Sequence, residues 1–335
     1  MKFLTTRIQF CCKLALVGLC LAAPRLFAQT APAKPAAMHE ENQHMRSRLF
    51  VYDLRDNSTH LVFTADTVWE APNWSPDGSY LIANSDGKIY KFSLKADGTA
   101  EPQKLAIPDS YSCNNDKAIS PDGKELAFSA GLKPVRGSQV FLADADGKNI
   151  RLMVAESPSF FHGWSPDSKT LAFVAIRNGE RQYDIYRIPA AGGTEQRLTM
   201  NPHHDDGPDY SPDGKWIYIN SDRSGKEAAW RFPADGAGAN DAKAEMVVSD
   251  SDEDWFPHIS PDGKKLVYIT YPAGTPTHNP RDVHIEFKLA EIDHDKVAKT
   301  QKTLVKAMGG QGSMNVNSWA PDSMRFAYVT YEALP

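Results

Sequence analysis

Apolar and polar residues alternate in short stretches along the chain, and six of these stretches follow the same kind of turn. Each copy reads aromatic or isoleucine, then Ser or Ala, Pro, Asp, and Gly or Ser. The copies begin at Asn73, Ala118, Gly163, Asp209, His258 and Ser318. They lie about 45 to 60 residues apart. A period of this size with strand-like content is typical of the blades of a β-propeller.

The residues of each copy predict a tight hairpin. Proline presets φ at the turn, aspartate accepts backbone hydrogen bonds, and glycine adopts a positive φ without steric penalty. Alternating apolar residues such as Leu126 and Phe128 then predict a strand with one buried face. Ser168 and Ser323 stand at the glycine position in two copies. A positive φ at these serines would cost on the order of 1 kcal/mol each.

Two further strands are predicted after a hairpin, so that one unit contains four strands. Third strands are expected at 88–94, 139–145, 184–190, 228–234 and 284–290, and short fourth strands at 150–155 and 195–200. The sixth copy ends after its second strand, whereas residues 48–64 read as a third and a fourth strand without a hairpin before them. We therefore predict an all-β fold, a six-bladed propeller in which 319–330 and 49–64 share one blade and close the ring.

The six turn copies and the strands after them resemble the TolB-like β-propeller family, whose repeats are also called WD40-like or PD40 repeats. The resemblance implies a propeller over residues 47–335. TolB is a periplasmic protein, so the resemblance implies an exported binding or protein-interaction module, with an envelope protein or an oligosaccharide as partner. Oligogalacturonate lyases are similar propellers whose rim histidines hold a divalent ion. The alternative function is therefore a carbohydrate-active enzyme, either a polysaccharide lyase or a glycoside hydrolase.

The first 28 residues are predicted to be a secretory signal peptide. Three basic residues precede or border an apolar stretch at 14–23, and a small-residue cleavage site ends at Ala28. That stretch is about half of the roughly 20 residues that span a bilayer, so we expect no stable membrane insertion after cleavage. Residues 29–46 are rich in alanine and proline and are predicted to be a flexible linker. We expect the protein in the periplasm or outside the cell.

Composition and motifs exclude several function classes. The formal net charge is −5 with both signs interspersed, so there is no basic stripe for nucleic acid. Only Cys113 remains after the signal peptide, and we expect no internal disulfide. The glycine-rich stretch GGQGSMN at Gly309 leads into a predicted propeller strand and not into a helix. It is therefore not predicted to bind phosphate.

Candidate functional residues fall at the entries to the innermost strands. Connections in a four-stranded blade alternate between the two faces of the disc, so these entries gather at one mouth of the central channel. The predicted ligand-binding residues there are Glu70, Asn115, Asp116, His162, His204, Asp205, Asp206, Asp254, Trp255, His258, Asn315 and Asn317. A long insertion in the fifth unit rises on the same face and adds Tyr271, His278 and Arg281.

These residue types leave several chemistries open. Imidazole and carboxylate ligands suit a divalent ion such as zinc, manganese or iron. The metal candidates are His162, His203, His204 and His258. Alternatively, a sugar-cleaving site needs two carboxyl groups as acid and base. The candidates for these are Glu70, Asp205, Asp206 and Asp254. Arg281 would then bind an acidic sugar, and Trp255 and Tyr271 would stack on it.

The same side chains also fit a purely structural role. Polar groups line any hydrated channel, Asp206 and Asp254 are able to accept turn N–H groups, and His258 precedes a core isoleucine. If the mouth residues are functional, Asp205→Ala and His162→Ala weaken ligand binding with little change in melting temperature. Trp164→Ala is instead expected to destabilise the fold by a few kcal/mol through lost packing.

Overall fold

The structure is a computed structural model that describes residues 44–293 and 296–335. The predicted signal peptide at 1–28 and nearly all of the predicted linker at 29–46 lie outside the described residues. The first strand begins at Met45, just inside the predicted end of the linker. Within the described ranges, no helix is long and apolar enough to cross a membrane.

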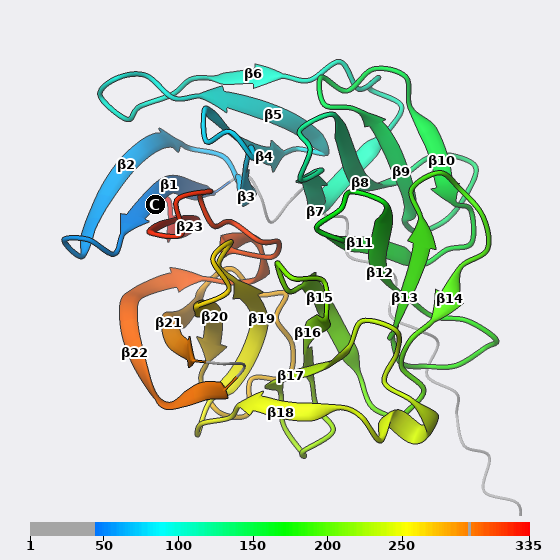
Figure 1. The fold of residues 1–335 in the computed structure, drawn as a ribbon. Helices are drawn as coiled ribbons and strands as arrows, with labels where there is room; N and C mark the ends of the chain where they lie inside the picture. Colours follow the sequence, from blue (N-terminus) through cyan, green and yellow to red (C-terminus); the bar gives the residue numbers. More distant parts are fainter. Residues whose placement is uncertain (1–43, 294–295) are drawn as a thin grey trace, which may run out of the picture. The chain divides into compact units, whose positions relative to one another are not determined.

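The described strands form six sheets around a common axis, and we number these sheets as blades 1 to 6 (Figure 1). In the lists that follow, the strand nearest the axis comes first. Blade 1 contains β3 (Glu70–Trp74), β4 (Tyr80–Ser85), β5 (Lys88–Ser93) and β6 (Pro102–Lys104). Blade 2 contains β7 (Ser112–Ile119), β8 (Glu125–Gly131), β9 (Gln139–Asp144) and β10 (Arg151–Val154). Blade 3 contains β11 (Ser159–Trp164), β12 (Thr170–Ala175), β13 (Asp184–Pro189) and β14 (Gln196–Arg197).

The later blades carry longer connections. Blade 4 contains β15 (Asp205–Tyr210), β16 (Trp216–Ser221), β17 (Ala228–Pro233), the 3-10 helix η1 (Ala239–Asp241) and β18 (Glu245–Val248). Blade 5 contains β19 (Glu253–Ile259), β20 (Lys265–Tyr271), β21 (Val283–Asp293) and β22 (Lys296–Gly309). Blade 6 contains β23 (Arg325–Ala333), β1 (Met45–Asp53) and β2 (Ser58–Ala65), and the 3-10 helix η2 (Gln311–Ser313) precedes it.

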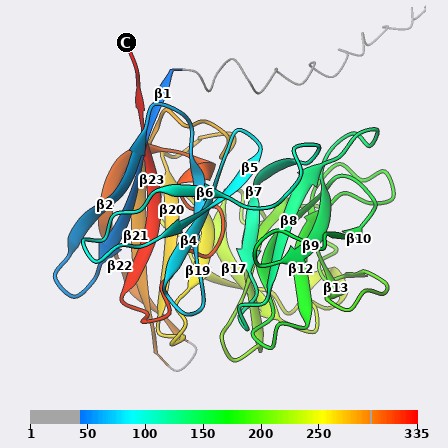
Figure 2. The same cartoon turned by 90° about the horizontal axis from the view of Figure 1, so that it is seen from above.

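Blade 6 closes the ring as the sequence predicted. β1 pairs antiparallel with β23 along its whole length, from Met45 opposite Ala333 to Asp53 opposite Arg325. The beginning of β1 and the end of β23 therefore lie at the same end of the disc (Figure 2). Trp319 forms an isolated bridge with Phe326 and takes the place of an innermost strand. The pairing of the two terminal strands therefore satisfies backbone groups that an open array would leave exposed.

The repeated turn is held by its serine and aspartate. In the first copy, the Ser75 hydroxyl donates to Asp77 Oδ1 at 2.7 Å and accepts the Tyr80 N–H at 3.1 Å. Ser168 and Ser323, which replace the glycine, do adopt positive φ angles of 60° and 58°. Each hydroxyl accepts a backbone N–H from the preceding blade, Asp122 at 3.0 Å and Asp262 at 2.9 Å. A hydrogen bond between blades thus offsets the strain at both serines.

Neighbouring blades are also joined by their apolar faces. Val140 and Leu142 of blade 2 belong to the same buried cluster as Leu171 and Phe173 of blade 3. Trp164 of blade 3 donates from Nε1 to the Ala118 carbonyl of blade 2 at 3.1 Å. The core therefore lies between the blades and surrounds the channel.

Candidate functional site

The innermost strands are irregular at one level of the channel. In each of blades 1 to 5, the pairing between the first two strands shifts in register near the middle of the first strand. In blade 2 the shift spans Cys113 to Lys117, and in blade 3 it leaves out His162. Such β-bulges turn side chains away from the regular alternation. Here the bulges bring the Asp116 and His162 side chains together in the channel, with His162 Nε2 3.8 Å from Asp116 Oδ1.

Four side chains from four blades meet at this level, and we call them the channel cluster: Asp116, His162, Asp206 and Asn315. The Nε2 atom of His162 lies 3.2 Å from Asp206 Oδ1 and 3.8 Å from Asp116 Oδ1. Asn315 donates from Nδ2 to Asp116 Oδ1. All four side chains are buried. The structure therefore brings together four of the residues predicted for the rim.

The pKa values of the two carboxyl groups in the channel cluster are shifted in opposite directions. Burial raises the pKa of Asp116 to about 6, and the nearby charge of Asp206 adds to the rise. Burial acts on Asp206 too, but the hydrogen bond and charge of His162 outweigh it and hold the pKa of Asp206 well below its usual range. In turn, Asp206 raises the pKa of His162 against the opposing effect of burial. Asp206 and His162 thus favour each other's charged forms, beside an Asp116 carboxyl group whose pKa is raised.

Two further histidines, His204 and His278, lie close enough to Asp206 for electrostatic coupling with its carboxyl group. Burial lowers the pKa of His204, but the hydrogen bond from Nδ1 to Glu227 Oε1 at 3.2 Å and neighbouring carboxylates raise it to about 9. The ring of His278 lies 4.3 Å from that of Trp255. Burial lowers the pKa of His278 to about 4. We expect His204 to be cationic and His278 neutral at pH 7.

Other predicted rim residues are engaged elsewhere. Asp205 is fully buried and pairs with Arg223 Nη2 at 2.7 Å, which is a structural ion pair. His203 is partly exposed, and its Nδ1 atom lies 3.3 Å from Asp222 Oδ1. Asp254 is fully buried, and its Oδ2 atom accepts the Asp250 N–H at 3.4 Å.

Glu70 and Arg281 form an ion pair with each other, with 2.6 Å between Oε1 and Nη2. Neither Glu70 nor Arg281 is therefore positioned in this structure to act as an isolated charge toward a ligand. Asn115 is buried in β7, and its carbonyl oxygen accepts a hydrogen bond from the Lys117 ammonium group at 3.5 Å.

The other end of the channel holds a cavity that the sequence did not predict. We call the face with the Ser-Pro-Asp turns the turn side and the opposite face the entry side. The turn-side cavity has a volume of about 320 Å³, and its wall contains Trp74, Trp164 and Trp319 together with turn prolines. His162 and Asn317 also line it. The aromatic residue or isoleucine and the proline of each turn copy were the available signal, but the sequence analysis interpreted them as structural.

Lys117 is a second feature that sequence reasoning missed. Its side chain is fully buried, and Nζ donates to the Ala71 carbonyl at 2.6 Å and to Asn84 Oδ1 at 2.8 Å. Burial lowers the pKa of Lys117 to about 7, although Glu70 and Asp116 oppose this. The amine links blade 2 to blade 1 directly beside the channel cluster. A lysine in a short strand gave no sign of this position.

The metal candidates do not form one ligand set. His258 lies on the turn side of the bulge with Nδ1 3.6 Å from Asp209 Oδ2, whereas His203 is on the surface. Among residues 44–293 and 296–335, no group of three or more His, Cys, Asp or Glu side chains is arranged to hold a metal ion. The residues present therefore do not fit the divalent ion that the resemblance to lyases implied.

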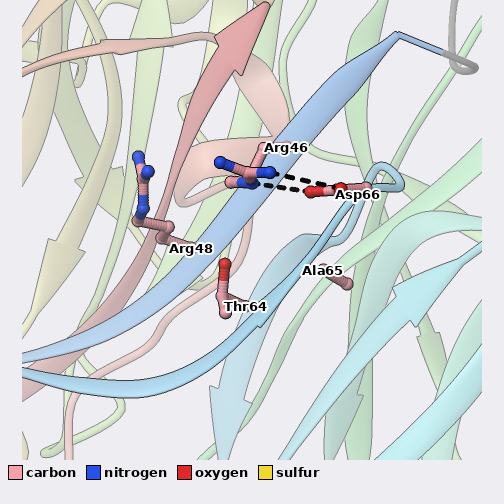
Figure 3. A pocket seen from close by; sticks show the side chains of 5 residues that line it. All are labelled: Arg46, Arg48, Thr64, Ala65 and Asp66. Carbon is pink, nitrogen blue, oxygen red and sulfur yellow. Dashed lines mark hydrogen bonds and ion pairs between the residues drawn. The ribbon is translucent and has the colours of Figure 1, made fainter. Parts of the chain in front are cut away.

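A cavity of about 470 Å³ lies outside the channel, on blade 6 (Figure 3). Arg46 and Arg48 line it. Arg46 Nε lies 2.6 Å from Asp66 Oδ1, and Arg48 Nη2 lies 2.6 Å from Glu332 Oε2. Because both guanidinium groups already have carboxylate partners, this cavity offers no isolated positive charge for an anion.

Comparison with known proteins gives matches that cover different shares of this chain and of the relatives. Residues 135–285 match the family described as the TolB beta propeller domain, PD40. The chain is 41% identical over 287 residues to an uncharacterized protein of Agrobacterium fabrum, and the match covers 86% of this chain and 93% of the relative. It is 23% identical over 228 residues to the Tol-Pal system protein TolB of Francisella tularensis. That match spans only 50% of the relative, or about half its length.

Solved structures show the same architecture. A TolB-type structure from Agrobacterium tumefaciens superposes with a TM-score of 0.79 at 40% identity, covering 87% of this chain and 99% of the other. TolB of Acinetobacter baumannii gives a TM-score of 0.56 at 19% identity, covering 79% of this chain and 64% of that one. An oligogalacturonate lyase from Vibrio parahaemolyticus gives 0.53 at 11% identity, with 84% and 82% covered. The last two likenesses show the fold alone.

Proposed function

Because this chain belongs to the TolB-like family of PD40 β-propellers, we propose that it is an exported binding module that takes its ligand in the central channel. The periplasm is the proposed location. An envelope protein or an oligosaccharide is the proposed partner. The similarity to TolB supports both statements, but it extends over only half of the TolB chain.

One observation carries the proposal: His162 belongs both to the channel cluster and to the lining of the turn-side cavity. A ligand in that cavity would meet the His162 imidazole, held in place by Asp206, with Asn317 beside it. The Trp74, Trp164 and Trp319 side chains would contact its apolar parts. A concave, mostly apolar site with a few fixed polar groups is the usual form of a ligand pocket.

The proposal is tested by binding measurements on the full chain. Calorimetry against neutral and acidic oligosaccharides and against purified periplasmic proteins should identify a ligand. His162→Gln should weaken its binding at least tenfold, whereas His60→Gln, on the exposed part of β2, should leave it unchanged. The proposal fails if no member of either panel binds, or if both variants bind the ligand as the natural protein does.

A carbohydrate-active enzyme is the second candidate, and one observation favours it. The pKa values of Asp116 and Asp206 are displaced in opposite directions around His162. One carboxyl group that holds a proton near neutrality beside one that stays ionised is the arrangement that general acid–base catalysis uses. Chromatography of oligosaccharides incubated with the protein should then show products that Asp116→Asn and Asp206→Asn abolish. Binding without products would leave the first proposal alone.

A further inference from the structure

The insertion of blade 5 lies against the segment that leads into blade 6. We call residues 272–282, between β20 and β21, the strap. Its His278 carbonyl accepts the Tyr271 hydroxyl at 3.2 Å and the Gln311 N–H of η2 at 2.9 Å. A Cβ atom at Gly310 would lie only 1.6 Å from the Pro280 carbonyl oxygen. Glycine is therefore required there by close backbone contact, which explains the glycine-rich stretch before blade 6.

The far end of the strap is fastened to blade 1. Arg281 donates from Nε and Nη2 to Glu70 Oε1 at 3.1 and 2.6 Å. Glu70 opens β3, so this contact passes beyond blade 6 and joins the insertion of blade 5 to the first blade. The Arg281 side chain is 27% exposed and that of Glu70 is 14% exposed. Water and salt weaken an ion pair that is partly exposed, which suits a contact that opens.

At the first of these attachments, the strap holds the His278 ring against two aromatic residues of β19. The His278 ring packs on Trp255 at 4.3 Å and on Phe256 at 5.3 Å between ring centres. The His278 ring also lies close enough to Asp206 to influence the pKa of that carboxyl group. Asp116 and Asp206 are 2% and 6% exposed in this arrangement. A ligand that approaches from the entry side therefore has no direct access to either carboxyl group.

The strap is exposed to solvent over much of its length. Pro272, Ala273 and Gly274 are exposed, as are Pro276 and Asn279. By contrast, β19 beneath it is buried along its whole length. Segments with few buried apolar contacts open at low free energy while the core stays folded. Movement of the strap therefore does not require blade 5 to unfold.

We propose that the strap is a gate on the entry side of the channel, and that the Arg281–Glu70 ion pair is its latch. Release of Arg281 lifts His278 from Trp255 and Phe256 and opens a path to Asp206 and Asp116. This inference rests on the proposed binding in the channel, since it names how the same site is controlled. It gives the channel two mouths, the open turn-side cavity and a gated entry side.

Hydrogen exchange of the full chain, followed by mass spectrometry, tests the latch without any ligand. Arg281→Gln and Glu70→Gln should each speed exchange in 272–282 and 311–313 about tenfold, while β19 and β20 exchange as in the natural protein. Carbethoxylation of His278 should rise by a similar factor. Arg48→Gln removes an exposed ion pair of blade 6 and is the matched control, which should change neither readout.

The reversed pair, Glu70→Arg with Arg281→Glu, separates a latch from general damage. It should restore most of the protection that each single variant loses. Unchanged exchange of 272–282 in both single variants would overturn the gate, as would faster exchange of β19 together with the strap. Because no ligand is present, a failed search for a ligand leaves this result intact, and a failed latch leaves binding through the turn-side cavity untouched.

Discussion

Asn317 of blade 6 donates a hydrogen bond from Nδ2 to Oδ2 of Asp209 in blade 4, 2.9 Å away, and so reaches past blade 5. Asn315, two residues earlier, reaches blade 2 in the other direction through Asp116. The segment that carries both asparagines forms only an isolated bridge, so its side chains are not committed to a regular strand. Blade 6 therefore joins its second neighbours on both sides across the channel.

We predict that Asn317→Asp destabilises the protein by about 1–3 kcal/mol at pH 7. The change replaces a donor with a second carboxylate beside Asp209 and removes the hydrogen bond to the Ile259 carbonyl at 3.0 Å. Urea denaturation measures the loss. Asn279→Asp, in the exposed part of the strap, is the control and should change the free energy of unfolding by less than about 0.5 kcal/mol. Equal effects would mean that the contact across the channel contributes nothing.

Ser168 offers a test of the turn between blades. Ser168→Ala keeps the strained φ of 60° but loses the hydrogen bond to the Asp122 N–H, and we expect a loss of about 1–2 kcal/mol. Ser168→Gly loses the same bond but relieves the strain, so its effect should be smaller by about 1 kcal/mol. Thermal unfolding of both variants gives the comparison. A glycine variant less stable than the alanine variant would contradict this reading.

Asp205 is expected to be essential for stability. Asp205→Ala removes the nearer of the two buried carboxylates that pair with Arg223, at 2.7 Å compared with 3.3 Å for Asp241, and should cost about 1.5–3 kcal/mol. This reverses the expectation from the sequence that the melting temperature would hardly change. Asp66→Ala, which breaks the exposed pair with Arg46, is the control and should cost no more than about 1 kcal/mol. Similar melting temperatures for Asp205→Ala and the natural protein would restore the original expectation.

Trp164 is predicted to stabilise the contact between blades 2 and 3 mainly by packing. Trp164→Ala should cost about 3–5 kcal/mol, because the side chain is buried against Phe161. Trp164→Phe keeps part of the packing but loses the hydrogen bond to the Ala118 carbonyl, so we expect a distinctly smaller loss. Denaturant unfolding followed by circular dichroism distinguishes the two. Equal losses would assign the stabilisation to the hydrogen bond.

Asp254 predicts a pH dependence of stability. Burial, together with the nearby charge of Asp250, raises its pKa to about 7. The folded protein therefore binds a proton that the unfolded chain has lost between about pH 4 and 7, and this group lowers stability as pH rises through that window. Asp254→Asn lacks this titration. Its stability relative to the natural protein should increase from pH 4.5 to 7 by at most about 1.4 kcal/mol per pH unit, and parallel profiles would refute the assignment.

The fold could be predicted because each blade repeats its own local signals. The Ser-Pro-Asp turn needs only residues within one hairpin, as the contacts of Ser75 with Asp77 and Tyr80 show. The missing strands of the sixth copy then indicated closure by residues 49–64, which the pairing of β1 with β23 confirms.

The site was predictable only in part, because it depends on contacts between distant residues. The gathering of Asp116, His162, Asp206 and Asn315 followed from their equivalent positions in different blades. The different roles of the two neighbouring aspartates, Asp205 paired with Arg223 and Asp206 paired with His162, could not be predicted. They depend on Arg223 and on the bulge after Asp206.

The contact of Arg281 with Glu70 was also beyond local reasoning. Its partners lie 211 residues apart, and the loop between β20 and β21 has no repeat in the other blades. A side chain that looked available for an acidic sugar is therefore already paired. The burial of Lys117 arises in the same way, from Ala71 and Asn84 of the neighbouring blade.

The pairing of β1 with β23 has a consequence for synthesis on the ribosome. β1 precedes the other described strands and pairs at once with β2 on one edge, but it obtains β23 on its other edge only after blades 1 to 5 have been translated. Until then the nascent chain carries an unpaired strand edge, a surface prone to aggregation that molecular chaperones recognise. Completion of the ring must therefore be a late event, and a ribosome that stalls before β23 releases a product in which one edge of β1 is still unpaired.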